Sequence, residues 1–145
     1  MPPAGRPDPF GAFNFIVEIE GIATAAFAEC TGLASETQVI EYRTGDMLTT
    51  AKLPGLTKYS NITLKRGMTR DDALWRWRRA AVDGRPERRN GAIVLLDEAR
   101  KPVLRLNFRN GWPCRWEGPH LNARGSAVAI ESIEIAHEGL ELTSS

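Results

Sequence analysis

The fold class of this chain is decided by three stretches: Phe13-Asn14-Phe15-Ile16-Val17-Glu18-Ile19, Val103-Leu104-Arg105-Leu106-Asn107-Phe108 and Ala129-Ile130-Glu131-Ser132-Ile133-Glu134-Ile135. Each mixes β-branched or aromatic residues with polar ones at a period of two, the pattern of a half-buried strand. The third belongs to a longer predicted strand, 127–137, which is apolar on both faces or bulged, so we expect protein on both sides of it. Further strands are predicted at 27–30, 36–43, 61–66, 92–97, 102–108 and 112–117. The sequence therefore predicts a mainly β protein.

One helix interrupts the strands, over residues 70–82. Thr69 is a suitable N-cap, and Asp72 three residues later completes a variant capping box. Gly84 suits the position after the last helical turn, and Pro86 prevents the helix from resuming. Trp77 shares one predicted face with three alanines, which indicates that this face packs on the core.

The domain organisation is simple. Four prolines among the first nine residues predict an extended N-terminal arm over residues 1–12, and residues 13–145 are predicted to form a single domain. Within that domain, residues 44–59 are predicted to form a long loop, and loops of that length usually carry function. The loop contains Pro54 and Gly55, yet several of its side chains are too apolar for a purely solvated tip.

Composition excludes several functional classes. Hydrophobic residues make up 42% and charged residues 26% of the 145 residues, as in ordinary soluble domains. A net charge of +1 gives no long-range attraction to nucleic acid or membrane. The N-terminus lacks an apolar stretch, so we expect no signal peptide, synthesis in the cytoplasm and no membrane insertion. Cys30 and Cys114 could pair, but in a reducing compartment two free buried thiols are expected.

No group of residues forms a recognisable catalytic or ligand-binding set. The two histidines, His120 and His137, lack the spacing of a metal site, and there is no Gly-rich phosphate loop. Neither cysteine has a nearby histidine that could activate it. We therefore predict no enzyme activity, no catalytic residues, no metal and no cofactor, and a function carried by surfaces.

Two charged clusters stand out. Residues 76–89 contain six arginines against Asp83 and Glu87, and residues 131–141 contain four glutamates with no Lys or Arg. The basic cluster could be an anion- or nucleic-acid-binding module in which Trp75 and Trp77 stack on bases, or a solvated helix face. Alternatively the clusters pair between identical subunits. The residues of that third hypothesis are Arg76, Arg79, Arg85, Arg88, Arg89, Glu131, Glu134, Glu138 and Glu141.

The chain resembles the tail tube proteins of contractile phage tails and contractile injection systems, the family typified by the phage T4 tube subunit. The resemblance runs from Asp8 to Leu142 and rests on the order and spacing of several stretches. These are Asp8-Pro9-Phe10, Phe13 to Gly21, Phe27-Ala28-Glu29-Cys30-Thr31-Gly32-Leu33, Ile40-Glu41-Tyr42-Arg43, Lys52-Leu53-Pro54-Gly55-Leu56-Thr57-Lys58-Tyr59, Ile62-Thr63-Leu64-Lys65-Arg66-Gly67, Leu74-Trp75-Arg76-Trp77, Asn107-Phe108-Arg109-Asn110-Gly111-Trp112-Pro113 and Ile130 to Leu140. Gly111 departs from the family pattern, in which a larger residue is expected.

The resemblance implies a β-sandwich or barrel of two packed antiparallel sheets with one helix. It implies hexameric rings of identical subunits, stacked into a hollow inner tube, with sheath, baseplate and tube-cap proteins as partners and a possible lumenal cargo. A tube-initiating baseplate paralogue is the alternative, and nucleic acid is not expected as a specific ligand. Such a chain becomes part of a phage-tail-like particle. The long loop is then expected at the interface between rings, through Met47, Leu48, Leu53, Pro54, Gly55, Leu56 and Tyr59.

Overall fold

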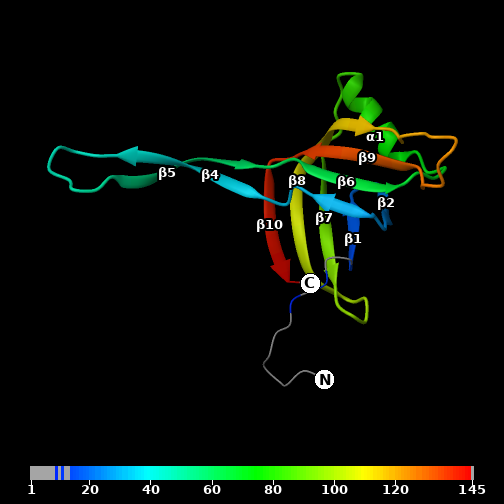
Figure 1. The fold of residues 1–145 in the computed structure, drawn as a ribbon, viewed down its shortest axis with the longest axis horizontal. Coiled ribbons are helices and arrows are strands. Elements are labelled where there is room, and N and C mark those ends of the chain that lie inside the picture. The colour runs from blue at the N-terminus through cyan, green and yellow to red at the C-terminus, as the bar shows by residue number, and fades with distance from the viewer. Residues whose placement is uncertain (1–8, 10, 12–13, 145) are drawn as a thin grey trace.

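The computed structural model describes Pro9, Gly11 and residues 14–144, so most of the predicted N-terminal arm lies outside the described residues. Over the described residues the chain forms ten strands and one helix (Figure 1). They are β1 (Phe15–Ile19), β2 (Ile22–Ala25), β3 (Glu29–Thr31), β4 (Ser35–Tyr42), β5 (Ala51–Tyr59), β6 (Ile62–Gly67), α1 (Ala73–Val82), β7 (Arg89–Leu96), β8 (Pro102–Glu117), β9 (Ile130–Ala136) and β10 (Gly139–Ser144).

Strand β8 joins two antiparallel sheets. The strand order is β2-β1-β7-β8-β9-β6-β3, and β10 also pairs with β8. The first part of β8 pairs with β7 and β10, and its second part, from Trp112 onward, pairs with β9. The predicted strands 102–108 and 112–117 are therefore one strand, whose change of partners falls at Asn110, where φ is +53°. The mainly β fold with two antiparallel sheets and one helix is confirmed.

The core lies between the two sheets and under the helix. Val17, Ile93 and Phe108 come from the first sheet and Ile133 from the second, and all four are nearly inaccessible to solvent. The Phe108 ring needs two glycines: a Cβ at Gly91 would lie 2.4 Å from its Cζ, and a Cβ at Gly111 would lie 2.7 Å from its Cε1. The larger residue that the resemblance predicts at Gly111 therefore has no room here.

Helix α1 packs on this core through Leu74 and Trp77, both buried. It begins at Ala73, and the predicted cap is wrong: Thr69 Oγ1 accepts a hydrogen bond from the Asp71 amide in the preceding turn instead. Asp71 Oδ1 in turn accepts from the Ala73 amide, so a turn over residues 69–72 leads into the helix. The C-terminal end is confirmed, with Val82 the last helical residue and Gly84 at φ +80°.

The C-terminal region contains one strand that was not predicted. β9 begins at Ile130 instead of residue 127, and β10 follows it after a short turn. Ile133 and Ile135 are fully buried, whereas Val128, which precedes β9, is exposed. The apolar residues of the predicted strand therefore do not form two buried faces within this subunit.

The prediction of a loop over residues 44–59 is wrong in its second half. Residues 51–59 form β5, which pairs antiparallel with β4 to make a separate two-stranded sheet, and only residues 43–50 connect the two. This sheet, the β4–β5 hairpin, extends far out from the body of the molecule (Figure 1).

Candidate assembly interface

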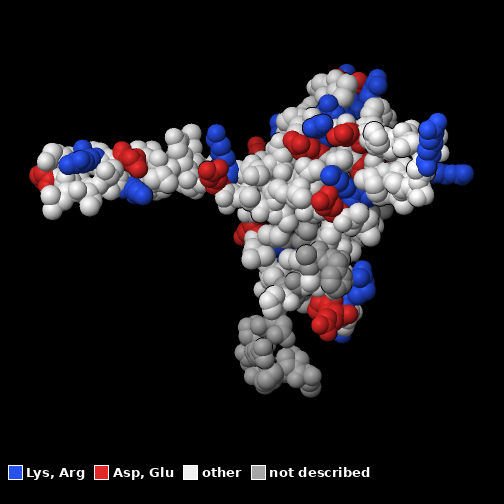
Figure 2. Space-filling view, in the orientation of Figure 1, with Lys and Arg blue, Asp and Glu red and all other residues white. Residues whose placement is uncertain are grey.

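The β4–β5 hairpin exposes apolar side chains along most of its length. Every residue of β4 is exposed, and Val39, Ile40 and Tyr42 are each about half accessible or more. Leu56 on β5 is 72% exposed, and Leu48 at the tip is 98% exposed. Figure 2 shows that much of the hairpin surface is uncharged. A row of exposed apolar residues on a two-stranded sheet, which is marginally stable alone in water, indicates a surface that another protein covers.

The hairpin has a defined register despite its exposure. Thr37 and Thr57 face each other, with their hydroxyls 3.0 Å apart, and a bulge follows between Thr37 and Val39. Pro54 lies opposite Val39, at a position where it cannot donate a backbone hydrogen bond. The bulge and the proline therefore interrupt the regular strand pairing of the hairpin at the same place.

The residues that the sequence predicts for the inter-ring interface are all in this hairpin. Leu48 is at the tip and Leu53, Pro54 and Leu56 are exposed on β5, whereas Tyr59 is half-buried at the base. Met47 and Gly55 are also half-buried: Met47 Sδ accepts from the Thr44 amide at 3.5 Å, and Gly55 lies against Ile40.

The base of the hairpin contains a residue, His137, that no sequence pattern singled out. It follows β9 and packs its ring against Tyr59 and Phe108, with ring centroids 5.7 and 6.1 Å away. Its Nε2 lies 2.9 Å from the Ser60 carbonyl oxygen, directly after β5, and its Nδ1 lies 3.0 Å from that of Gly139. His137 therefore links the hairpin base to the start of β10, a contact between segments too distant in sequence for any local pattern to reveal.

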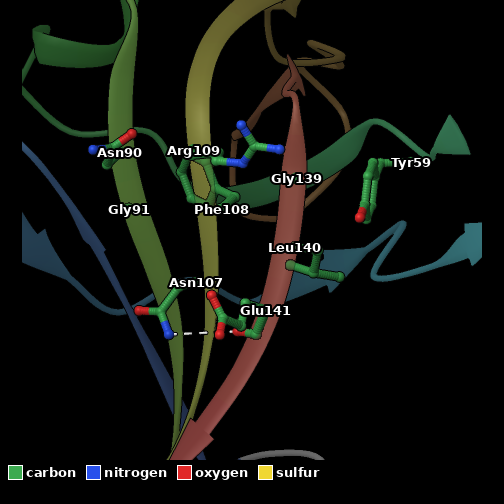
Figure 3. A pocket seen from close by; sticks show the side chains of 9 residues that line it. All are labelled: Tyr59, Asn90, Gly91, Asn107, Phe108, Arg109, Gly139, Leu140 and Glu141. Atoms are coloured by element: carbon green, nitrogen blue, oxygen red, sulfur yellow. Dashed lines mark hydrogen bonds between the residues drawn. The ribbon is translucent and has the colours of Figure 1, made fainter. Parts of the chain in front are cut away.

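A hollow of about 520 Å³ lies beside this junction, between β5, β7, β8 and β10 (Figure 3). Tyr59, Phe108 and Leu140 contribute its apolar part, and Arg109 and Glu141 are among its polar lining residues. It holds no set of acid, base and nucleophile, because Glu141 is its one carboxylate and no His, Ser or Cys lines it.

Most of the predicted basic residues already have partners within the chain. Arg76 pairs with Asp72 and Arg79 with Asp83, each at the i, i+4 spacing of α1 or its end. Arg89 donates to Glu87 and to the Glu20 carbonyl, and its guanidinium lies 5.4 Å from the Trp77 ring centroid. Of the five predicted arginines, Arg85 and Arg88 are exposed and have no ion-pair partner among the residues that the structure describes.

The tryptophans do not suit the nucleic-acid hypothesis. Trp77 is buried, and its Nε1 donates to the Glu87 carbonyl at 2.7 Å, so it cannot stack on a base. Trp75 is 42% exposed but forms an edge-to-face pair with Trp116, with centroids 4.9 Å apart. Of the two tryptophans in the basic segment, Trp75 alone is exposed enough to contact a base, and Trp116 already covers part of its ring.

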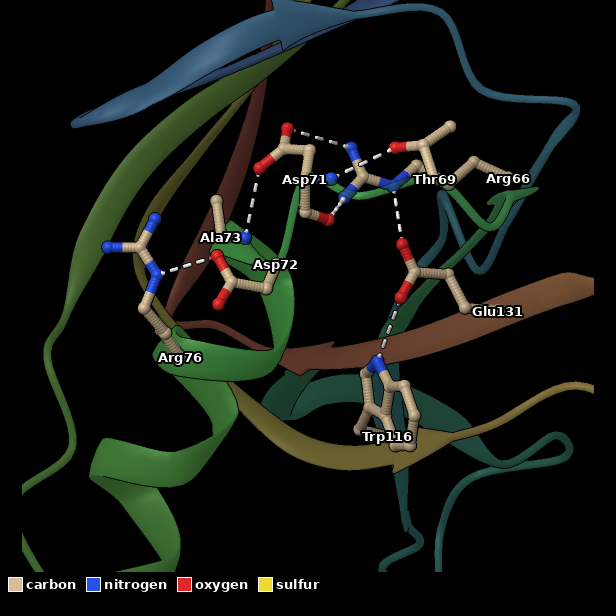
Figure 4. A network of polar contacts seen from close by, with 8 residues as sticks. All are labelled: Arg66, Thr69, Asp71, Asp72, Ala73, Arg76, Trp116 and Glu131. Carbon is tan, nitrogen blue, oxygen red and sulfur yellow. Dashed lines mark hydrogen bonds and ion pairs between the residues drawn. The ribbon is translucent and has the colours of Figure 1, made fainter.

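The four predicted acidic residues differ in exposure and in their partners. The prediction that Glu131 pairs with a neighbouring subunit is wrong. Glu131 shares the buried face of β9, and its Oε1 accepts from Arg66 Nε at 2.6 Å (Figure 4). It is therefore unavailable to a neighbouring subunit. Glu134 accepts from Asn61 and Glu138 from Asn110, while Glu141 is exposed on β10.

The remaining features to consider are potential metal ligands, the two cysteines and the length of the helix. Among residues 14–144 no three His, Cys, Asp or Glu side chains come together as metal ligands would. Cys30 and Cys114 are free thiols; burial raises the pKa of Cys30 to about 11, and burial followed by the Glu134 charge raises that of Cys114. The single helix in the described part of the chain is too short to cross a membrane.

Comparison with known proteins agrees with this geometry. The sequence model for the T4-like virus tail tube protein gp19 family matches residues 11–141. A chain in the structure of the anti-feeding prophage cap, its tube-terminating cap, is 25% identical with a TM-score of 0.88, over 99% of this chain and 97% of that one. A chain of the extended PVC sheath-tube complex, an extracellular contractile injection system, is 24% identical with a TM-score of 0.85, over 94% and 93%.

More distant structures share only the fold. Hcp1 from Flavobacterium johnsoniae is 12% identical, with a TM-score of 0.60 over 92% of this chain and 97% of that one. A search among curated protein sequences found no match.

Proposed function

We propose that this chain, which belongs to the T4-like virus tail tube protein family, is the subunit of the inner tube of a contractile injection system or phage-like tail. In this proposal six copies form a ring, and rings stack into a tube with a hollow lumen. The function is structural, since the tube is the part that a contracting sheath would drive into a target.

The observation that carries this proposal is the β4–β5 hairpin. Its apolar residues, Leu48 and Leu56 above all, lie on an element that extends away from the body and is exposed on both faces. A single copy cannot cover them. Burial against neighbouring copies would offset the entropy lost on ordering the hairpin, because each square ångström of apolar surface removed from water contributes roughly 25 cal/mol.

The proposed partners follow from the similar structures. Those structures are of a PVC sheath-tube complex and of the tube-terminating cap and the baseplate of the anti-feeding prophage. We therefore propose that this chain contacts a sheath protein along the tube, and cap and baseplate proteins at its ends, and that cargo travels in the lumen.

A terminal role is the second candidate, because chains in the cap and baseplate structures are as similar to this one as the chain in the sheath-tube complex. The two roles differ in what one chain can build alone. A main tube subunit elongates into tubes of many rings, whereas a terminal paralogue stops at one ring.

Negative-stain microscopy of the purified protein, together with light scattering, tests this proposal. Long tubes are the expected result, and single six-fold rings without tubes would transfer the assignment to the terminal role. A monodisperse single-chain species at high micromolar concentration, without rings in the images, would contradict both.

A further inference from the structure

The β4–β5 hairpin meets the body of the molecule at its base (Figure 1). Its two strands pair with each other and form a sheet of their own. Their last register pair is Ser35 with Tyr59, and the Ser60 amide then donates to the Ala34 carbonyl at 3.1 Å. The contacts that residues 59 and 60 make with the body therefore help to set the direction in which the hairpin points.

His137 holds this base from the side of the body. Its Nε2 lies 2.9 Å from the Ser60 carbonyl oxygen, and its Nδ1 lies 3.0 Å from the Gly139 carbonyl oxygen at the start of β10. The ring packs against Tyr59 and Phe108, so the direction of both nitrogens is fixed by aromatic contacts as well. Among the described residues, all its hydrogen-bond partners are backbone atoms.

The two contacts of His137 need two ring N–H groups, because a carbonyl oxygen only accepts hydrogen bonds. The imidazolium alone has both. A neutral ring with its hydrogen on Nε2 keeps the Ser60 contact but leaves the Nδ1 lone pair 3.0 Å from the Gly139 oxygen, although Nδ1 can accept from the Gly139 amide at 3.3 Å. A neutral ring with its hydrogen on Nδ1 sets two lone pairs against each other at Ser60. Loss of the proton therefore weakens the hold on the hairpin.

The groups around the ring ordinarily titrate outside the range in which histidine does. On the elements packed against it they are Tyr59 of β5, Arg109 of β8, which lies against Gly139 (Figure 3), Glu138 just before β10 and Glu141 of β10. Lys58 and Glu134 belong to the other faces of β5 and β9. Side chains of these types ordinarily titrate below about pH 5 or above about pH 9, whereas histidine gains its proton near about pH 6.5.

We propose that His137 is a pH-sensitive latch on the β4–β5 hairpin. Below about pH 6 the imidazolium donates to the Ser60 and Gly139 carbonyls together and fixes the hairpin base to the start of β10. Above about pH 7 the ring has one N–H to share between the two carbonyls, and the base is freer to move. The latch is a property of the single chain. Its consequence, that pH regulates how the hairpin is presented to another ring, rests on the proposed tube function.

Hydrogen exchange read by mass spectrometry tests the latch on subunits diluted until light scattering detects no assembly. Exchange rates of peptides covering residues 34–42 and 51–60 are corrected for the intrinsic rate at each pH. The latch predicts about tenfold greater protection at pH 5.5 than at pH 8, the ratio that 1.4 kcal/mol gives, near the lower end for a hydrogen bond to a charged group. Peptides of β7 should not show this change.

Variants of the two histidines assign the effect. His137→Gln keeps an amide donor that does not titrate, and His137→Phe keeps an aromatic ring without a donor, so both should lose the pH dependence of hairpin exchange. The matched control is His120→Gln, which removes an exposed histidine and should behave as the parent does. Equal pH dependence in the parent and His137→Phe would overturn the latch, and so would parent hairpin peptides whose protection does not rise at pH 5.5.

Nuclear magnetic resonance reads the ring itself and needs no change at His137. In His120→Gln with nitrogen-15-labelled histidine, His137 gives the only imidazole signals. Both ring nitrogens should be protonated at pH 5.5, and one at pH 8. A ring that is still neutral at pH 5.5 would overturn the latch and leave the tube function standing. A parent protein that forms neither rings nor tubes, with the exchange result as expected, would overturn the tube function and leave the latch standing.

Discussion

The Arg66–Glu131 ion pair is the charged interaction on which the second sheet and the start of α1 depend. Both side chains are more than nine-tenths buried, and together they hold Trp116 and the turn before the helix. Burial makes each charge costly without its partner, so removal of one leaves the other uncompensated. The pair thus holds Trp116 and the turn before α1 in place.

Glu131→Ala should lower the free energy of unfolding by about 3 kcal/mol, because Arg66 would remain buried with only its longer ion pair to Asp71, at 3.7 Å. Urea unfolding followed by tryptophan fluorescence measures this. Glu131→Gln, which keeps an acceptor for Trp116, should cost less. The control is Glu117→Gln, which removes the exposed partner of Arg115 and should cost less than about 1 kcal/mol. If Glu131→Ala and Glu117→Gln lower the free energy of unfolding equally, the buried pair contributes no more to stability than the exposed pair.

Cys30 makes stability depend on alkaline pH. Its pKa is about 11 in the folded chain against 9.0 in the reference state, because burial disfavours the thiolate. Between these values the unfolded chain has released the proton and the folded chain retains it, so stability falls as pH rises from about 9 to 11. The parent protein should therefore lose stability relative to Cys30→Ala over this window and not below it. A constant difference between the two unfolding free energies from pH 8 to 11 would contradict the pKa shift.

Single residues show where sequence patterns stop being informative. The spacing of Ile133 and Ile135 placed them on one face, and Glu131 falls on that same face; a carboxylate there looks solvated until the distant Arg66 is known. Gly111 likewise looks anomalous until the Phe108 ring is seen to fill the space beside it. Both depend on contacts between segments, which a local period cannot contain.

At the scale of elements, the β4–β5 hairpin should be separable from the fold. Thr37 and Thr57 are register partners, so an Asn-Gly turn in place of residues 38–56 can close the shortened strands. The shortened chain should melt within a few degrees of the parent, form rings and form no long tubes. Circular dichroism and negative-stain images check these points, with Thr49→Ser as the control that retains the hairpin. Full-length tubes from the shortened chain would exclude the hairpin from the interface between rings.

The same hairpin explains the main error of the sequence prediction. Strands are recognised by alternation between a buried and an exposed face, and β5 has no buried face within the subunit. Pro54 and Gly55 add the usual signs of a loop. The strands of the body, such as β1 and β6, do alternate, so their positions could be predicted to within a few residues. The apolar character of residues 44–59 still indicated an interface.

At the scale of the whole molecule, the two ends of the body differ. The hairpin extends from one side of the body, and α1 does not lie on that side (Figure 1). In the proposed ring, neighbouring subunits would meet through other surfaces, and the exposed basic and acidic residues that have no partner within the described chain are available there.

These residues supply the last prediction, which concerns ring closure. Arg85 and Arg88 follow α1 and are exposed, and Glu141 is exposed on β10. We propose that they pair between neighbouring subunits. Each exposed pair contributes only about 0.2–1 kcal/mol, but closure of a ring repeats the contact around its circumference. R85E/R88E should therefore reduce the assembled fraction in sedimentation, and raised salt should reduce it for the parent because the charges are screened.

The reciprocal change separates a specific pair from a general effect of charge. E141R added to R85E/R88E restores opposite signs across the contact and should recover part of the lost assembly, as coupled residues do in a double-mutant cycle. Arg124→Glu, an exposed reversal in the loop between β8 and β9, should leave assembly unchanged. Arg89 is unsuitable for this test, because its contacts with Trp77 and the Glu20 carbonyl belong to the subunit itself. If assembly is insensitive both to salt and to R85E/R88E, the two charged clusters are solvated surfaces and the ring closes through apolar and backbone contacts alone.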